Sequence, residues 1–126
     1  METYSADLEV RFRDLDPMQH VNNSVYSTFL EQTRARFSEE VLGMPLADLD
    51  TVLRYVEISF ERPIEGVGTV TVELTVDDLG RSSIPMSYEL FSEGERVATA
   101  ETVLVYFDRE TGESKRIPDD IRERLS

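Results

Sequence analysis

The segment DLDPMQHVNN, which runs from Asp14 to Asn23, brings chemically active side chains close together. It holds two aspartates, two asparagines and the only histidine of the chain. A carboxylate such as that of Asp16 could act as a nucleophile or as the base that activates water, and the imidazole of His20 could orient it. Asp and Asn are also residues that favour turns and helix caps. The segment is therefore a candidate active site, a helix cap, or both.

The rest of the composition limits the chemistry available to these residues. Cysteine is absent, which excludes disulfides, thiolate nucleophiles and cysteine-ligated metals. One histidine without cysteine argues against a zinc site, and the sequence contains no glycine-rich phosphate-binding loop. We therefore expect a reaction that needs neither a metal nor another cofactor.

The charge of the chain is strongly negative. Asp and Glu number 26 against 13 Lys and Arg, which gives a net charge of −13. A field of this sign repels nucleic acid and anionic membrane surfaces, so we expect neither as a partner. Lys115 is the only lysine, and an acidic, lysine-poor composition is similar to that of proteins from halophilic archaea. In molar salt the Debye length falls to about 3 Å, so self-repulsion would cost little there. An ordinary acidic protein is the alternative.

The elements on either side of the segment must position it. Residues 7–13 alternate in polarity, with Phe12 on the apolar face, which predicts a strand. Residues 24–42 carry apolar side chains at helical spacing, which predicts a helix of about five turns. A polar residue at positions 22–24 could cap its start, and Gly43 stands where it should end.

Four further strand patterns follow this helix, near residues 56–61, 69–76, 81–91 and 96–107, with a hairpin turn at 92–95. The last strand is apolar or small on both faces and is expected to be central, whereas Pro85 should lie at an edge or a bulge. A short helix after Pro118 closes the chain. The order is β-α-β-β-β-β with a short C-terminal helix. One long helix wrapped by a five-stranded antiparallel sheet makes a single α+β domain over residues 1–126, in the hotdog arrangement.

Residues 11–34, RFRDLDPMQHVNNSVYSTFLEQTR, resemble the signature of the hotdog-fold thioesterases of the 4-hydroxybenzoyl-CoA thioesterase type. Their pattern is approximately D-x-D-x-x-G-H-V-N-N-x-x-Y, followed by an acidic residue and an arginine on the helix. It is matched here by Asp14, Asp16, His20, Val21, Asn22, Asn23, Tyr26, Glu31 and Arg34. The later stretches SFERPI, LGRSS and VATAETVLV extend the resemblance over nearly the whole chain.

The segment is also similar to the plant acyl-ACP thioesterases, but two positions depart from the family patterns. Gln19 stands where most acyl-CoA members have glycine, although the plant enzymes have glutamine. Met18 stands where the plant enzymes carry a catalytic asparagine. The plant-type mechanism therefore cannot be carried over whole, whereas Asp16 is common to both groups.

The resemblance implies roles for particular residues. Asp16 would be the nucleophile or general base, His20 would orient it or polarise the substrate, and the backbone N–H of Asn23 would bind the thioester carbonyl. Substrate contacts are implied for Asn22, Tyr26, Phe29, Ser59 and Phe60. For the first three, capping or core packing is an alternative, and Glu31 and Arg34 are expected to form an (i, i+3) ion pair. The phosphates of CoA need positive charge, for which Arg81 is one candidate among Arg62, Arg81, Arg96, Arg109 and Arg116, and a solvated surface arginine is the alternative for each.

The leading interpretation is an acyl-CoA thioesterase that releases a free acid and CoA. A non-catalytic acyl-binding module, an acyl-ACP thioesterase, and a hotdog hydratase or dehydratase are the alternatives. Those hydratases carry D-x-N-P-x-H, whereas Asp16 and His20 are four apart with no Asn-Pro between them. The resemblance also implies a homodimer or homotetramer with the acyl site at the subunit interface. Because no signal peptide or membrane-length apolar run is visible, we expect a cytoplasmic protein.

Overall fold

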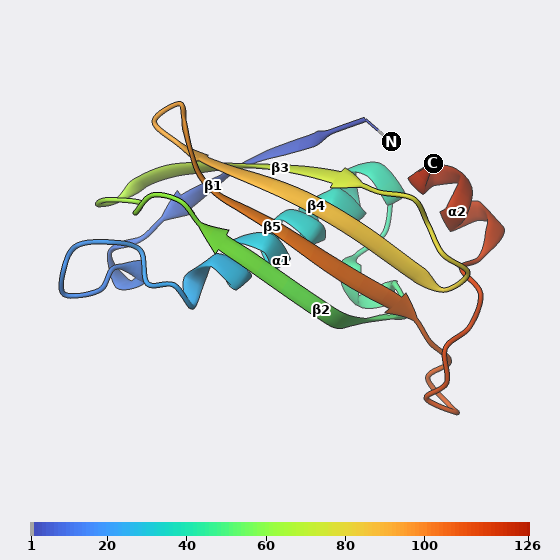
Figure 1. Ribbon diagram of the computed structural model, residues 1–126. Coiled ribbons are helices and arrows are strands. Elements are labelled where there is room, and N and C mark those ends of the chain that lie inside the picture. Colours follow the sequence, from blue (N-terminus) through green and yellow to red (C-terminus); the bar gives the residue numbers. More distant parts are fainter. Residues whose placement is uncertain (1) are drawn as a thin grey trace.

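One antiparallel sheet of five strands forms the body of the molecule, with a long helix against one of its faces (Figure 1). The computed structural model describes residues 2–126. The strands lie in the order β1-β3-β4-β5-β2. Their bounds are Tyr4–Val10 for β1, Thr51–Phe60 for β2, Gly68–Val76 for β3, Ser83–Ser92 for β4 and Glu95–Tyr106 for β5. The predicted α+β hotdog arrangement and its element order are confirmed.

Helix α1 (Val25–Phe37) continues without interruption into a π-helical turn, η2 (Ser38–Leu42). It ends at Gly43, whose φ of 73° is the left-handed conformation that glycine adopts without steric cost. The predicted helix over 24–42 is therefore confirmed to within one residue. Its buried face packs on the inner face of the sheet and carries Tyr26, Phe29, Leu30, Thr33, Arg34 and Phe37.

Two local predictions at the far end of the chain are also confirmed. Strands β4 and β5 are joined by a two-residue turn in which Glu93 and Gly94 have φ of 52° and 78°, as tight hairpin turns require. The chain closes with α2 (Asp119–Leu125), which begins directly after Pro118.

The first strand lies differently from its prediction. β1 begins at Tyr4 and ends at Val10, and Phe12 falls in a 3-10 turn (Phe12–Asp14) where it is 77% exposed. The placement of Phe12 on a buried face was therefore wrong, because the alternating pattern continued past the end of the strand.

Strand β5 is an interior strand, as expected, because it pairs with β4 on one side and with the edge strand β2 on the other, while β4 occupies the middle of the sheet. Pro85 lies in β4 just beyond the last residue pair with β3, and its carbonyl oxygen accepts the N–H of Asp77. At that point β4 has no strand neighbour on the β3 side, so Pro85 sits at a local edge, as predicted.

Strand β2 forms one edge of the sheet and is mostly exposed along its length. Within residues 2–126 it pairs only with β5. Five of its large apolar side chains are between 43% and 50% exposed: Val52, Leu53, Tyr55, Val56 and Phe60. Among residues 2–126, no helix is long and apolar enough to cross a membrane.

Candidate active site

A cavity of about 260 Å³ lies where the loop after β1 meets the start of α1 and the end of β2. It brings together five of the residues predicted for the site: Asp16, His20, Asn23, Tyr26 and Phe60. Val21, Glu61, Arg62 and Pro63 complete its lining. Three of these four follow β2 in the SFERPI stretch, which already carried part of the family resemblance, but no signal of their own pointed to them.

Asp16 is held by its own loop. Its Oδ1 accepts the backbone N–H groups of Met18 at 2.9 Å and of His20 at 3.1 Å. Its backbone N–H donates to the carbonyl of His20 at 2.8 Å, which closes the loop. Within residues 2–126, Oδ2 accepts no hydrogen bond. One oxygen therefore orders the loop and the other is free to act in the cavity that Asp16 lines.

The loop turns at Gln19, which has a φ of 64°. Residues other than glycine and asparagine rarely adopt this left-handed conformation, so the glycine that the family pattern has at this position would adopt it without steric cost. The next residue, His20, places Nε2 3.6 Å from Oε1 of Glu65, so its imidazole faces a carboxylate other than Asp16. His20 contacts Asp16 through its backbone and not through its ring.

The start of α1 supplies an unpaired backbone donor. The side-chain Oδ1 of Asn22 accepts the N–H of Ser24 at 3.0 Å, and the carbonyls of Asn22 and Asn23 accept the N–H groups of Val25 and Tyr26. Asn22 therefore orders the turn that leads into α1, whose N-cap residue, Ser24, makes no side-chain capping hydrogen bond. Within residues 2–126, the N–H of Asn23 has no acceptor, and Asn23 lines the cavity. Unpaired N–H groups at a helix start, together with the helix dipole, favour a negatively charged group.

Asp14 orders the approach to this loop. It is 3% exposed, and its Oδ2 accepts the backbone N–H of Arg11 at 2.7 Å while Oδ1 lies 3.2 Å from Nη2 of the same residue. Burial alone would raise the pKa of Asp14, but the backbone and side-chain hydrogen bonds from Arg11 outweigh it and lower the pKa. Its carbonyl accepts the N–H of Asn22, so Asp14 also fixes the turn that leads into α1.

Aromatic rings form the apolar side of the cavity. Tyr26 is 2% exposed, and its ring packs edge-on against Phe60 with centroids 4.8 Å apart. Burial raises the pKa of Tyr26, partly offset by a hydrogen bond with the backbone of Ile64. Phe29 is 1% exposed and lies behind Tyr26, at 6.1 Å between centroids, so it supports this wall from the core.

The structure does not bring Ser59 and Arg81 into this cavity. Ser59 precedes Phe60 in β2 and therefore points to the opposite face of the sheet, where it lines a different cavity with Glu57 and Thr99. Arg81 lies in the loop between β3 and β4, where its carbonyl accepts the N–H of Ile117. That loop is at the end of the sheet opposite the cavity (Figure 1).

The expected ion pair between Glu31 and Arg34 was wrong. Arg34 is 5% exposed and donates from Nη1 to the hydroxyl of Tyr88 at 3.2 Å, while Glu31 is exposed. Arg34 lies on the buried face of α1, so its guanidinium faces the sheet. There the hydroxyl of Tyr88 is also hydrogen-bonded to that of Thr102. Among residues 2–126, no cluster of three or more His, Asp or Glu side chains is arranged to hold a metal ion.

Comparison with known proteins places this geometry among thioesterases. Residues 10–125 match the family model of the thioesterase-like superfamily. The long-chain acyl-CoA thioesterase FadM of Escherichia coli is 30% identical over 125 residues, which cover 95% of each chain. The crystal structure of a thioesterase from Thermus thermophilus, complexed with coenzyme A and Zn, superimposes with a TM-score of 0.87 at 35% identity. That match covers 96% of this chain and 90% of the other.

A second solved structure supports the fold alone. The DHNA-CoA thioesterase of Staphylococcus aureus has a TM-score of 0.89 at 23% identity, and the match covers 98% of this chain and 89% of the other.

Proposed function

This chain belongs to the thioesterase-like superfamily, and on that premise we propose that it hydrolyses an acyl-CoA to the free acid and CoA. Two relatives support the choice of substrate, because one is an acyl-CoA thioesterase and the other is complexed with coenzyme A. The observation that carries the proposal is the pairing, in one cavity, of a carboxylate oxygen and a backbone N–H that both lack protein partners within residues 2–126.

Each of the two groups has a role in the proposed reaction. Asp16 Oδ2 attacks the thioester carbonyl carbon directly or removes a proton from a water that does so. The N–H of Asn23, at the positive end of α1, binds the carbonyl oxygen as it becomes negative. The CoA thiolate then leaves and takes up a proton. After direct attack, water hydrolyses the resulting anhydride between the acyl group and Asp16, which releases the free acid and restores the carboxylate. His20 acts less directly, because it contacts Asp16 through the backbone and its ring faces Glu65.

The apolar wall receives the start of the acyl group in this proposal. Phe60 is 47% exposed, and it covers Tyr26 at the side of the cavity. The core beneath is closed, since Tyr26 and Phe29 are at most 2% exposed. A longer acyl chain would therefore leave the cavity along the exposed strand β2.

We also propose that the active form is a homodimer or a pair of dimers, with the acyl site at the subunit interface. The exposed apolar side chains of β2 support this proposal, because an unpaired strand edge of this kind invites pairing with another chain. The cavity lies at one end of that edge, where Phe60 is the last residue of β2.

The variant Asp16→Asn tests the catalytic role. Asparagine keeps Oδ1 as an acceptor for Met18 and His20, so the loop and the melting temperature should be nearly unchanged. We expect kcat to fall by roughly 10²-fold or more, the scale of a lost base or nucleophile, and His20→Ala to cost roughly tenfold. The control Asp7→Asn, on an exposed residue bonded to Thr71, should keep full activity. Full activity of Asp16→Asn would overturn the assignment.

A further inference from the structure

An irregular segment between β2 and β3 runs beside the loop that carries Asp16. It comprises residues 61–66, with the sequence ERPIEG. Its first two residues, Glu61 and Arg62, both donate their backbone N–H groups to the carbonyl of Val97, at 2.8 Å and 3.0 Å. Val97 is 3% exposed and belongs to β5. The start of this 61–66 segment is therefore fixed to the sheet.

The middle of the 61–66 segment is anchored in the core. Ile64 is 2% exposed. Its carbonyl accepts the N–H of Val21 at 2.9 Å, and its backbone is also hydrogen-bonded to the hydroxyl of Tyr26. Backbone atoms of one buried residue thus contact both the Asp16 loop and the aromatic wall of the cavity.

The end of the segment pairs with the turn of the Asp16 loop. Glu65 forms an isolated antiparallel bridge with His20, and the N–H of Gly66 donates to the carbonyl of Gln19 at 2.9 Å. The segment and the loop therefore form a short antiparallel pair that is separate from the five-stranded sheet.

The hydrogen bond from Gly66 is made to a residue in a strained conformation. Gln19 has a φ of 64°, and Gly66 itself has a φ of 70°. A left-handed residue other than glycine persists only where the contacts around it fix its backbone. A Cβ on Gly66 would meet no atom within 4 Å, so this position needs glycine for its backbone conformation and not for lack of space. A side chain that resists this conformation should therefore move the N–H away from Gln19.

The turn at Gln19 sets the direction of the Asp16 carboxylate. The two N–H groups that bind Oδ1 of Asp16 belong to Met18 and His20, the residues on either side of Gln19. If the turn opened, these two N–H groups would no longer hold one oxygen between them. Oδ2 would then lose its position relative to the N–H of Asn23, and a displacement of about 1 Å can slow a reaction roughly 10²-fold.

From these contacts we propose that Gly66 is a positioning residue of the thioesterase reaction. Its N–H holds the turn at Gln19, and through that turn it holds the carboxylate of Asp16 in its reactive direction. The inference rests on the proposed function and extends it to a residue from a distant part of the chain.

The first experiment compares Gly66→Val with Gly66→Asn. Valine resists a positive φ because its β-branched side chain clashes with the backbone, whereas asparagine tolerates it. We expect Gly66→Val to lower kcat for an acyl-CoA roughly tenfold or more with KM nearly unchanged, because the carboxylate moves while the substrate contacts remain. Gly66→Asn should keep most of the wild-type kcat. If Gly66→Val does not fold, Gly66→Ala makes the same comparison with less strain.

Gly112→Val is the matched control. Gly112 has a φ of 74°, a Cβ there would also meet no atom within 4 Å, and its N–H donates to the carbonyl of Asp108 at 2.7 Å. It lies between β5 and α2, at the end of the sheet opposite the cavity (Figure 1). Gly112→Val should lose a similar amount of stability and keep the wild-type kcat. An equal loss of kcat in both valine variants, or wild-type kcat in Gly66→Val, would overturn the proposal.

A double variant decides whether Gly66 acts through Asp16. If Gly66→Val works by displacing the carboxylate, it should change the residual kcat of Asp16→Asn by less than about twofold, because the group that it displaces is already absent. Losses that multiply would mean that Gly66 acts on another part of the site, and this result would contradict the proposal.

Hydrogen exchange tests the contact without a measurement of activity. In Gly66→Val the amides of His20 and Val21 should exchange roughly tenfold faster than in the wild type, while the amide of Val72 in the middle of β3 should not change. Unchanged exchange at His20 and Val21 would refute the role of Gly66 in holding the turn. A wild type that hydrolyses no acyl-CoA would instead refute the proposed function.

Discussion

At the scale of single residues, Asp16 combines two demands that usually exclude one another. Its Oδ1 is fully used by the loop, with two backbone donors, while Oδ2 accepts no hydrogen bond within residues 2–126. The adjacent helix start shows the same division, since the Asn22 side chain orders the turn before α1 and the N–H of Asn23 has no acceptor within residues 2–126. The turn that leads into α1 and the candidate active site are therefore one structure here.

The left-handed residue in this loop offers a test of stored strain. Gln19 has a φ of 64°, a conformation that costs a non-glycine residue about 1 kcal/mol. We expect Gln19→Gly to leave the protein as stable or more stable by up to about 1 kcal/mol, because relief of strain competes with the greater entropy of unfolded glycine. Thermal melts would measure it. The control Gln32→Gly, inside α1, should instead destabilise by about 1 kcal/mol, and an equal loss at both positions would refute the strain at Gln19.

At the scale of elements, β2 is the strand whose apolar side chains and outer edge stay exposed in a single chain. Every other strand either has two neighbours or, like β1, is largely buried on one face, as its pattern of Ala6, Leu8 and Val10 shows. β2 carries exposed apolar side chains along the edge that lacks a partner within residues 2–126. The same strand ends at the candidate site, so assembly along it would bear directly on the site.

A charged residue on this strand tests assembly without disturbing the core. Val56 is 43% exposed, so Val56→Glu should keep the chain folded while placing a carboxylate on the proposed interface. We expect light scattering to report a folded monomer with reduced activity. Val67→Glu, at a 64% exposed position outside the strands, should leave the assembly as in the wild type. A Val56→Glu protein that keeps its wild-type mass would argue against a β2 interface.

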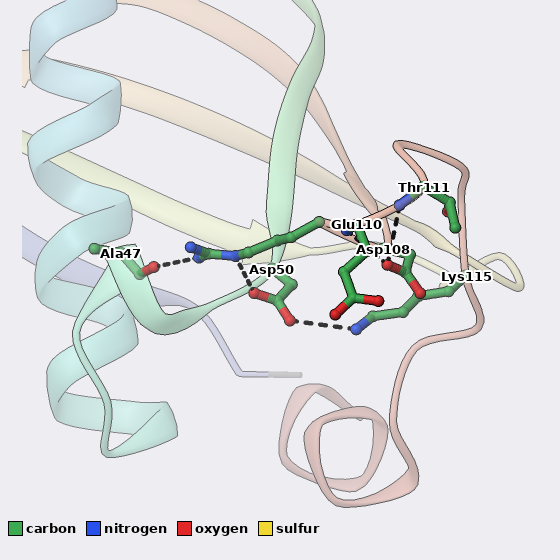
Figure 2. Close-up of polar contacts among 7 residues, drawn as sticks. Ala47, Asp50, Asp108, Glu110, Thr111 and Lys115 are labelled. Atoms are coloured by element: carbon green, nitrogen blue, oxygen red, sulfur yellow. Dashed lines mark hydrogen bonds and ion pairs between the residues drawn. The ribbon is translucent and has the colours of Figure 1, made fainter.

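At the scale of the whole molecule, charge sets the conditions under which the fold is most stable. The net charge of −13 acts against compaction and against association of two identical chains. Local pairing offsets part of this repulsion, as in the contacts of Arg96 with Glu61 and Glu89 and of Asp50 with Arg109 and Lys115 (Figure 2). Such exposed pairs contribute little individually, so most of the repulsion remains for salt to screen.

We therefore expect the melting temperature and the activity to rise between 0.1 M and about 3 M KCl, as the Debye length falls from about 10 Å to a few ångströms. Melts and rate measurements over that range would check it. Because hydrophobic burial also responds to some salts, KCl should be compared with equal concentrations of NaCl. A melting temperature that is flat or falls in both salts would remove the basis for the halophilic interpretation.

Local features of the sequence determined the kinds of element and their order. Apolar spacing marked α1, the left-handed preference of Gly43 marked its end, and Glu93-Gly94 marked the hairpin, because each depends on neighbouring residues alone. The loop residues Asp16, His20 and Asn23 were also accessible to this reasoning, since they lie within eight positions of one another and so share a cavity.

Only the tertiary structure decided what depends on distant parts of the chain. It placed β5 beside the edge, turned Ser59 away from Phe60, set Arg81 at the far end and buried Arg34 against Tyr88. These outcomes follow from strand order, strand face and helix docking, which are set by contacts between segments far apart in sequence. A period of two or 3.6 residues shows that a side chain alternates or recurs. It does not show which distant surface that side chain will meet.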